Sequence, residues 1–274
     1  KGTGGGLALY AVAAILRGNT LRENTASAAV EGLGGGIYAH YAALSGSENV
    51  LQGNVAGCSP ADKLSAGGGL YALNTTVNLS GNQVVENVAN AATSGNGVGG
   101  GLYVYSFDPT AKQASLTANT IQGNTASRAG SGYGGGLYMR NMDATVTNNA
   151  LLGNTAGTLS GAGGGLFVAT DYYTPTSRIA ITGNTFRGNA AAGSGIGTGG
   201  GIFMGVYSAI VSPLGTVGAD TRLSGNTIIS NTASTSGAGF GGGVALFSGT
   251  DNVTVAGNTL SENLASANDE GWGG

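Results

Sequence analysis

Charged side chains are scarce in this chain, at 8% of 274 residues, against about 25% in an ordinary soluble domain. The ten lysines and arginines are scattered and the net charge is −3, so the basic patch that nucleic-acid binding needs is missing. No run of about 20 apolar residues occurs, which excludes a membrane-spanning helix in this segment. The sequence therefore predicts neither a nucleic-acid partner nor a membrane span.

Cysteine, histidine and proline are also rare, at one, one and four residues. The single Cys58 cannot form an internal disulfide, and the single His40 has no companion that would indicate a zinc site or a catalytic triad. Glycine is abundant, at 55 residues, but without the Gly-X-Y period of collagen. Because hydrophobic residues make up 41% of the chain, it is not a disordered one.

The chain consists of eight copies of one unit, seen for example between Ser224 and Ala233. Each copy has two asparagines five residues apart, an apolar residue two positions after the first and an alanine two positions after the second. The first asparagines are Asn19, Asn49, Asn82, Asn119, Asn149, Asn184, Asn226 and Asn258. The second are Asn24, Asn54, Asn87, Asn124, Asn154, Asn189, Asn231 and Asn263. A repeat of this length indicates a solenoid or another array.

Every repeat opens with three glycines and then Leu, Ile or Val, and successive triplets are 29 to 42 residues apart. The triplets start at Gly4, Gly34, Gly67, Gly99, Gly134, Gly163, Gly199 and Gly241. Apolar residues then alternate, Leu70 with Ala72 and Val77 with Leu79, which is the period of a strand. We predict three short strands per repeat and an all-β parallel β-helix of about eight coils, forming one domain over residues 1–274. A β-propeller does not fit, because its blades need antiparallel strands joined by hairpins. A leucine-rich repeat does not fit either, because it needs its own regular spacing of leucines.

The asparagines and glycines are expected at the corners of the coils. A stacked asparagine amide can accept a hydrogen bond from one coil and donate one to the next. Glycine is suited to a corner where φ is positive or where two backbones approach closely. We therefore interpret the two asparagine series as structural ladders along the axis.

The paired motif resembles that of right-handed parallel β-helix proteins of the pectin-lyase-like type, and most of all the repeats of polymorphic membrane proteins and autotransporter-type surface proteins. Phe186-Arg187-Gly188-Asn189 matches their Phe-x-x-Asn motif, and Gly163-Gly164-Gly165-Leu166 matches Gly-Gly-Ala-Leu with glycine in place of alanine. The other seven coils replace the phenylalanine with Leu, Ile or Val. The resemblance implies a right-handed coil and covers all eight repeats, but this scaffold has many functions.

Length varies mainly between the glycine triplet and the first asparagine, where 12 to 24 residues intervene. Loops on a rigid scaffold often have the functional residues, and the candidates at this corner are Asp108, Asp143, Asp171, Tyr172 and Tyr173. If the three aspartates stack, they predict a calcium site or an acid pair that cleaves carbohydrate. The alternative is that each aspartate only begins a turn. No other cofactor is expected.

An aromatic column follows the triplets, in the second position after each one. Its members are Tyr38, Tyr71, Tyr103, Tyr138, Phe167 and Phe203. If the preceding aliphatic residue points inward, these rings form an exposed ladder that suits sugar binding or lateral packing. The alternative is cross-strand stacking that only stabilises the sheet. Threonines beside the first asparagine suggest ice binding, but Val50, Gln83 and Ala150 interrupt their column.

The two ends of the chain share one register, Lys1–Gly5 with Glu270–Gly274, and neither has a capping segment. Uncapped solenoid ends predict that coils continue in the same chain or in a neighbouring copy, and head-to-tail contacts of this kind give filaments. The function we expect is a non-catalytic, extracellular structural rod in a bacterial surface adhesin or fibre. The alternative is a module that binds cell-surface carbohydrate or cleaves polysaccharide with the Asp and Tyr corner.

Overall fold

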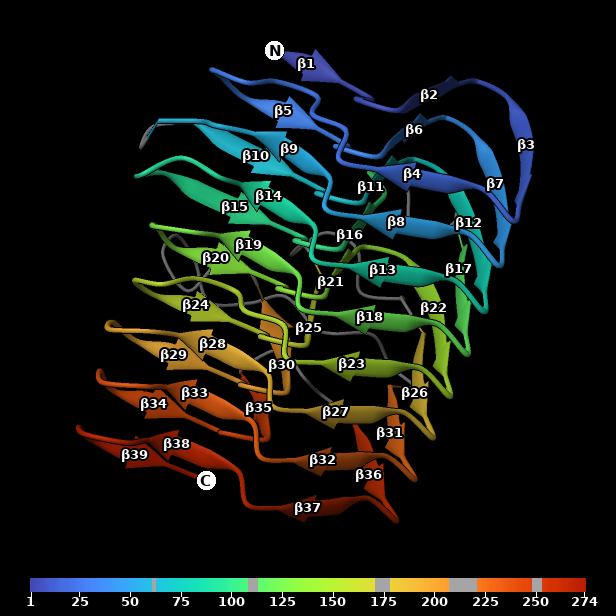
Figure 1. Ribbon diagram of the computed structural model, residues 1–274. Helices are drawn as coiled ribbons and strands as arrows, with labels where there is room; N and C mark the ends of the chain where they lie inside the picture. The colour runs from blue at the N-terminus through green and yellow to red at the C-terminus, as the bar shows by residue number, and fades with distance from the viewer. Residues whose placement is uncertain (61–62, 108–112, 171–177, 207–220, 248–252) are drawn as a thin grey trace.

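The computed structural model describes residues 1–60, 63–107, 113–170, 178–206, 221–247 and 253–274. The chain winds into a right-handed parallel β-helix whose coils stack from the N-terminal coil at the top of Figure 1 to the C-terminal coil at the bottom. Three of its sheets contain eight strands each, one per coil. The predicted fold class is confirmed. Among the described residues, no helix is long and apolar enough to cross a membrane.

Sheet A lies directly before the glycine triplets and has the shortest strands. In spatial order they are β1 (Gly2–Thr3), β5 (Gly32–Leu33), β10 (Leu64–Ala66), β15 (Asn96–Val98), β20 (Gly132–Tyr133), β24 (Gly161–Ala162), β29 (Gly197–Thr198), β34 (Gly239–Phe240) and β39 (Gly271–Trp272). Sheet B follows the triplets, where the first predicted strand was expected. It contains β2 (Leu7–Tyr10), β6 (Ile37–His40), β11 (Leu70–Leu73), β16 (Leu102–Tyr105), β21 (Leu137–Arg140), β25 (Leu166–Thr170), β30 (Ile202–Val206) and β35 (Val244–Leu246).

Sheet C leads to the first asparagine, as the second predicted strand does. Its strands are β3 (Ala13–Arg17), β7 (Ala43–Ser47), β12 (Thr76–Ser80), β17 (Gln113–Thr117), β22 (Asp143–Thr147), β26 (Ile179–Thr182), β31 (Arg222–Ser224) and β36 (Thr254–Ala256). Sheet D lies between the two asparagines. It consists of β4 (Thr20–Arg22), β8 (Val50–Gln52), β13 (Gln83–Val85), β18 (Thr120–Gln122), β23 (Ala150–Leu152), β27 (Thr185–Arg187), β32 (Thr227–Ile229) and β37 (Thr259–Ser261).

Sheet E follows the second asparagine in two groups of three strands. The first group is β9 (Val55–Gly57), β14 (Val88–Asn90) and β19 (Thr125–Ser127), and the second is β28 (Ala190–Ala192), β33 (Thr232–Ser234) and β38 (Leu264–Ser266). The third predicted strand of each repeat is therefore divided at the second asparagine into a part in sheet D and a part in sheet E. The division arises because the asparagine turns the chain at a corner.

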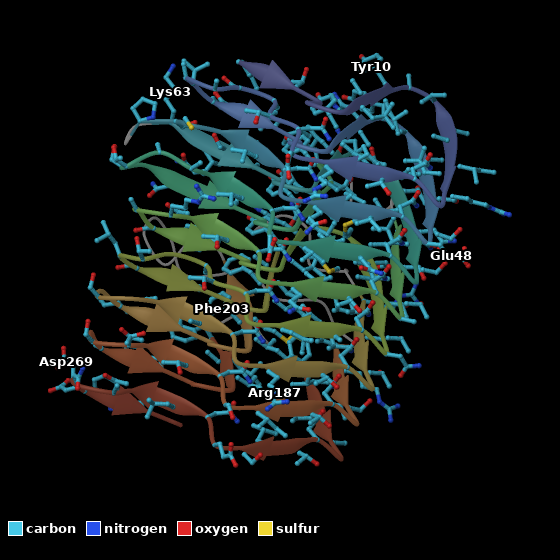
Figure 2. All side chains as sticks on the ribbon, viewed as in Figure 1. Tyr10, Glu48, Lys63, Arg187, Phe203 and Asp269 are labelled. Carbon is cyan, nitrogen blue, oxygen red and sulfur yellow. The ribbon has the colours of Figure 1, made fainter. Side chains whose placement is uncertain are left out.

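Equivalent residues of successive coils stand directly above one another. Leu70 pairs in register with Leu102, which pairs with Leu137, and the same register continues through sheets C and D. The alternating apolar residues point inward from three sheets and form one continuous core, which includes Leu116 and Ile121. Charged side chains such as Glu48, Arg187 and Asp269 lie on the outside (Figure 2). The strand period of the sequence thus creates an apolar interior along the whole axis.

Gly46 is an exception in the inner column of sheet C, where Leu16 and Leu79 flank it in the neighbouring coils. A small apolar cavity lies beside it. We expect Gly46→Ala to raise the free energy of unfolding by about 1 kcal/mol, because alanine orders more easily in a strand and adds a buried methyl group. The new Cβ would lie 2.8 Å from Cδ2 of Leu79, the mobile end of a flexible side chain. Urea denaturation measures this change. The control is Ser45→Ala at an outward position of the same strand, which should change the free energy of unfolding very little.

Candidate functional site

The two asparagine series form continuous ladders along the axis, at the corners between sheets C and D and between sheets D and E. Asn124 shows the pattern inside the rod. Its Oδ1 accepts hydrogen bonds from the backbone N–H and the Nδ2 of Asn87, at 2.9 and 3.0 Å. Its Nδ2 donates to Oδ1 of Asn154 at 3.0 Å and to the carbonyl of Val84 at 2.8 Å.

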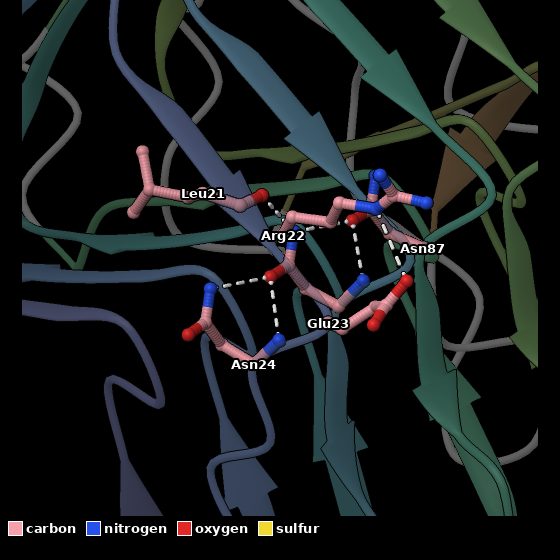
Figure 3. A network of polar contacts seen from close by, with 6 residues as sticks. Leu21, Arg22, Glu23, Asn24 and Asn87 are labelled. Carbon is pink, nitrogen blue, oxygen red and sulfur yellow. Dashed lines mark hydrogen bonds and ion pairs between the residues drawn. The ribbon is translucent and has the colours of Figure 1, made fainter.

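The same arrangement recurs in the first coils (Figure 3). Asn24 donates its backbone N–H and its Nδ2 to Oδ1 of Asn54, and Asn54 donates its Nδ2 to the carbonyl of Leu21 and to Oδ1 of Asn87. Among protein side chains, the neutral amides of Asn and Gln combine an acceptor with two donors, so stacking them accumulates no charge. The ladders therefore satisfy the corner backbone while allowing the coils to repeat without electrostatic cost.

The aromatic column lies on the outer face of sheet B, and its rings stack from coil to coil. Neighbouring ring centroids from Tyr38 to Phe203 are 4.8 to 5.4 Å apart, and the ring planes are within 10° of parallel. Five of the six members are nevertheless buried, and only the first is partly exposed. The buried rings are Tyr71, Tyr103, Tyr138, Phe167 and Phe203. The expectation of an exposed ladder is therefore wrong for these five rings.

Sheet A explains part of this burial. The residues directly before the glycine triplets, such as Leu33, Ala66 and Val98, pack against the rings and form a second apolar cluster outside the main core. The Tyr133 ring also contacts the Phe167 ring, with centroids 5.5 Å apart. Sequence reasoning missed sheet A because its strands are only two or three residues long. The sequence feature from which sheet A could have been predicted is the apolar residue that precedes most of the glycine triplets.

Burial raises the pKa of the Tyr71 and Tyr103 hydroxyls above the ordinary value of 10.0, and neighbouring tyrosines raise it further. Because the unfolded chain loses these protons at lower pH than the folded chain, stability is retained below pH 10 and falls as the pH rises above it. Above pH 10, we expect the free energy of unfolding to fall by about 1.4 kcal/mol per pH unit for each tyrosine that stays protonated in the folded chain. Urea denaturation between pH 9 and pH 11.5 measures the slope, which should be shallower in the Tyr71→Phe/Tyr103→Phe variant. An unchanged slope in that variant would contradict the assignment.

Of the five candidates at the corner before sheet C, only Asp143 lies within the described residues. Asp108, Asp171, Tyr172 and Tyr173 lie outside them, so the proposed calcium site or acid pair stays a prediction. Asp143 begins β22, and its Oδ1 accepts a hydrogen bond from the backbone N–H of Arg178 at 2.7 Å. Its Oδ2 is 3.6 Å from the Arg178 guanidinium. No group of three or more His, Cys, Asp or Glu suited to a metal occurs in the part of the chain that the structure describes.

His40 lies in an aromatic cluster on the outer face of sheet B. Its Nδ1 is 3.2 Å from the hydroxyl of Tyr38, and its ring stacks on Tyr41 with centroids 4.1 Å apart. Its Nε2 is buried and has no hydrogen-bond partner among the described residues, and burial lowers the pKa of the ring. The cluster therefore favours the neutral imidazole, held by ring contacts.

A shallow groove of about 410 Å³ runs over the outer face of sheet C. It crosses β12, β17 and β22 and reaches the start of β26, and Asp143 and Arg178 lie in its lining. The other described side chains that point outward into the groove are Thr76, Asn78, Gln113, Ser115, Thr145 and Ala180. Sequence reasoning missed this surface, although polar residues alternate with apolar ones along each of these strands.

Comparison with models of known protein families, with curated proteins and with solved structures finds no match to this chain. The fold and the geometry of its surfaces therefore define the class of protein, a parallel β-solenoid of stacked, nearly identical coils.

Proposed function

We propose that this chain is a non-catalytic, extracellular structural rod, part of a bacterial surface adhesin or fibre. The observation that supports it is the pair of asparagine ladders, which join every coil to the next through the same hydrogen bonds. A coil added to a face of the stack would meet the same partners, whether it belonged to this chain or to a neighbouring copy. Such contacts extend an assembly along one axis without closing it, which is how filaments form.

The composition agrees with a role outside the cell. Because only 8% of the residues are charged, the interactions of this chain depend little on salt or pH. The neutral ladders likewise contain no group that titrates in the physiological range. We infer that the rod serves to display or connect other parts at a fixed distance from the cell.

Immunogold electron microscopy tests this proposal on intact cells of the organism that encodes the chain. An antibody raised against the purified domain should label the cell surface, and negative-stain images of the purified protein should show rods that associate end to end. Label confined to the cytoplasm would overturn the extracellular assignment. Cleavage of a polysaccharide by the purified chain, abolished by Asp143→Ala, would contradict the non-catalytic part.

A further inference from the structure

We propose that the outer face of sheet C binds an extended, uncharged glycan chain that lies along the helix axis and crosses β12, β17, β22 and the start of β26. This proposal goes beyond the structural role of the rod. It concerns the groove of about 410 Å³ described above, whose volume is within the range of small-molecule binding sites, about 300 to 1,000 Å³.

The groove presents unused hydrogen-bonding groups. Asn78, Gln113 and Thr145 point outward and are exposed, and the structure gives none of their side chains a hydrogen-bond partner among the described residues. Each of these groups can donate and accept, which is the chemistry that sugar hydroxyls require. A ligand with hydroxyls on every repeating unit would therefore find a partner in successive coils.

The charge of the groove selects against other polymers. Among the described residues of its lining, Asp143 and Arg178 are charged, and they pair with each other at 3.6 Å. Nucleic acids and anionic glycans need several unpaired basic residues, which the described part of this lining does not offer. A peptide strand normally adds to the open edge of a sheet, whereas β17 and β22 are hydrogen-bonded to neighbours on both sides. An uncharged, hydroxyl-rich chain fits the surface best.

The spacing of the side chains sets the direction of the ligand. Outward residues such as Gln113 and Asp143 lie in register on adjacent strands, which are about 4.8 Å apart. One sugar of an extended glycan spans nearly this distance, so a chain along the axis places one unit over each strand. Four strands then contact about four sugars.

The same face continues toward the N-terminal coils. A second groove of about 260 Å³ is lined by Ile15, Arg17, Ser45, Ser47 and Ser80, and it shares Asn78 with the first. The two grooves together form one elongated surface along sheet C rather than an isolated pocket. We therefore expect affinity to increase with the length of the glycan, from two sugars to at least four.

The test uses the full chain and a panel of neutral oligosaccharides of two to eight sugars, derived from cellulose, xylan, mannan and β-1,3-glucan. Binding is measured by isothermal titration calorimetry. The triple variant Asn78→Ala/Gln113→Ala/Thr145→Ala should bind at least about tenfold more weakly, because it loses three hydrogen-bonding side chains. The matched control is Gln83→Ala/Thr120→Ala/Gln122→Ala on the outer face of sheet D, which should bind like the unchanged chain. Thermal melting establishes that both variants are folded.

Three results would overturn the proposal. The first is no binding to any member of the panel, and the second is an equal loss in the sheet C and sheet D variants. The third is binding restricted to anionic chains such as polygalacturonate or alginate, which would show that charge and not hydroxyl recognition governs the site. None of these results changes where antibody labels the cell, so the rod proposal is judged separately.

Discussion

Asn124→Ala should lower the free energy of unfolding by about 3 to 6 kcal/mol, a large part of the stability of a typical domain. The substitution removes the acceptor of the Asn87 backbone N–H and Nδ2, and the donor to the Val84 carbonyl. These groups are enclosed between coils, where an unpaired donor or acceptor costs about 1 to 3 kcal/mol. Urea denaturation followed by circular dichroism measures the change.

The control for this prediction is Asn78→Ala, which removes the same amide from an exposed position on sheet C and should change stability by less than about 0.5 kcal/mol. Equal effects of the two substitutions would show that the ladder does not stabilise the fold.

Asn124→Asp adds a pH test of the same ladder. The aspartate side chain has nearly the same shape as asparagine, but its carboxylate has no N–H to donate. It would face two hydrogen-bond acceptors, Oδ1 of Asn154 and the carbonyl of Val84. Burial raises the pKa of such a carboxyl group in the folded state, so the folded chain holds the proton more tightly than the unfolded one. The variant should therefore lose stability as the pH rises from 4 to 8, whereas the unchanged chain should not follow that trend.

Gly100→Ala should cost more than about 4 kcal/mol or prevent folding. Gly100 is the middle residue of its triplet, and a Cβ there would overlap the carbonyl oxygen of Gly135 in the next coil and the backbone of Thr125 across the coil. Both obstacles are main-chain atoms that cannot rotate away. The measurements are soluble yield, circular dichroism and, where the variant folds, urea denaturation.

The matched control is Gly81→Ala at an open corner. A Cβ at Gly81 meets nothing within 4 Å, but its φ of +62° is unfavourable for alanine and should cost about 1 kcal/mol. Ala118 occupies the equivalent corner in the next coil with φ +54°, so the backbone there accepts alanine. If Gly100→Ala were no worse than Gly81→Ala, close packing between coils would not be the reason for the middle glycine.

The triplet needs glycine at its three positions for different reasons. Gly99 has a φ of +60°, Gly100 lies against backbone, and a Cβ on Gly101 would come within 2.6 Å of the Gly136 carbonyl oxygen and 3.0 Å of Asn124. The sequence showed that the triplet recurs and that positive φ or close approach was the cause. It did not show which cause applies to which glycine, because that depends on the neighbouring coil.

Asp143 illustrates the limit of sequence reasoning at the candidate sites. Its position at the start of a strand follows from the spacing to the next asparagine, and so does its place next to Gln113 of the preceding coil. The same spacing places Arg178 next to Asp143, because Arg178 also lies six residues before the first asparagine of its coil, Asn184. The spacing does not reveal the hydrogen bond from the Arg178 backbone N–H or the ion pair, because both depend on how the side chains are oriented in the folded chain.

The sequence by itself determined the coil, the strands of sheets B, C and D, and the register in which asparagine stacks on asparagine. These features depend on spacings of a few residues and on the alternation of apolar side chains, which are local properties of the chain. Only the tertiary structure decided which outer faces are covered: sheet A packs beside the aromatic column from Tyr71 to Phe203, whereas sheet C presents an open polar groove. The physical reason is that burial of an outer face depends on how a neighbouring segment folds against it, and no short-range pattern specifies that contact.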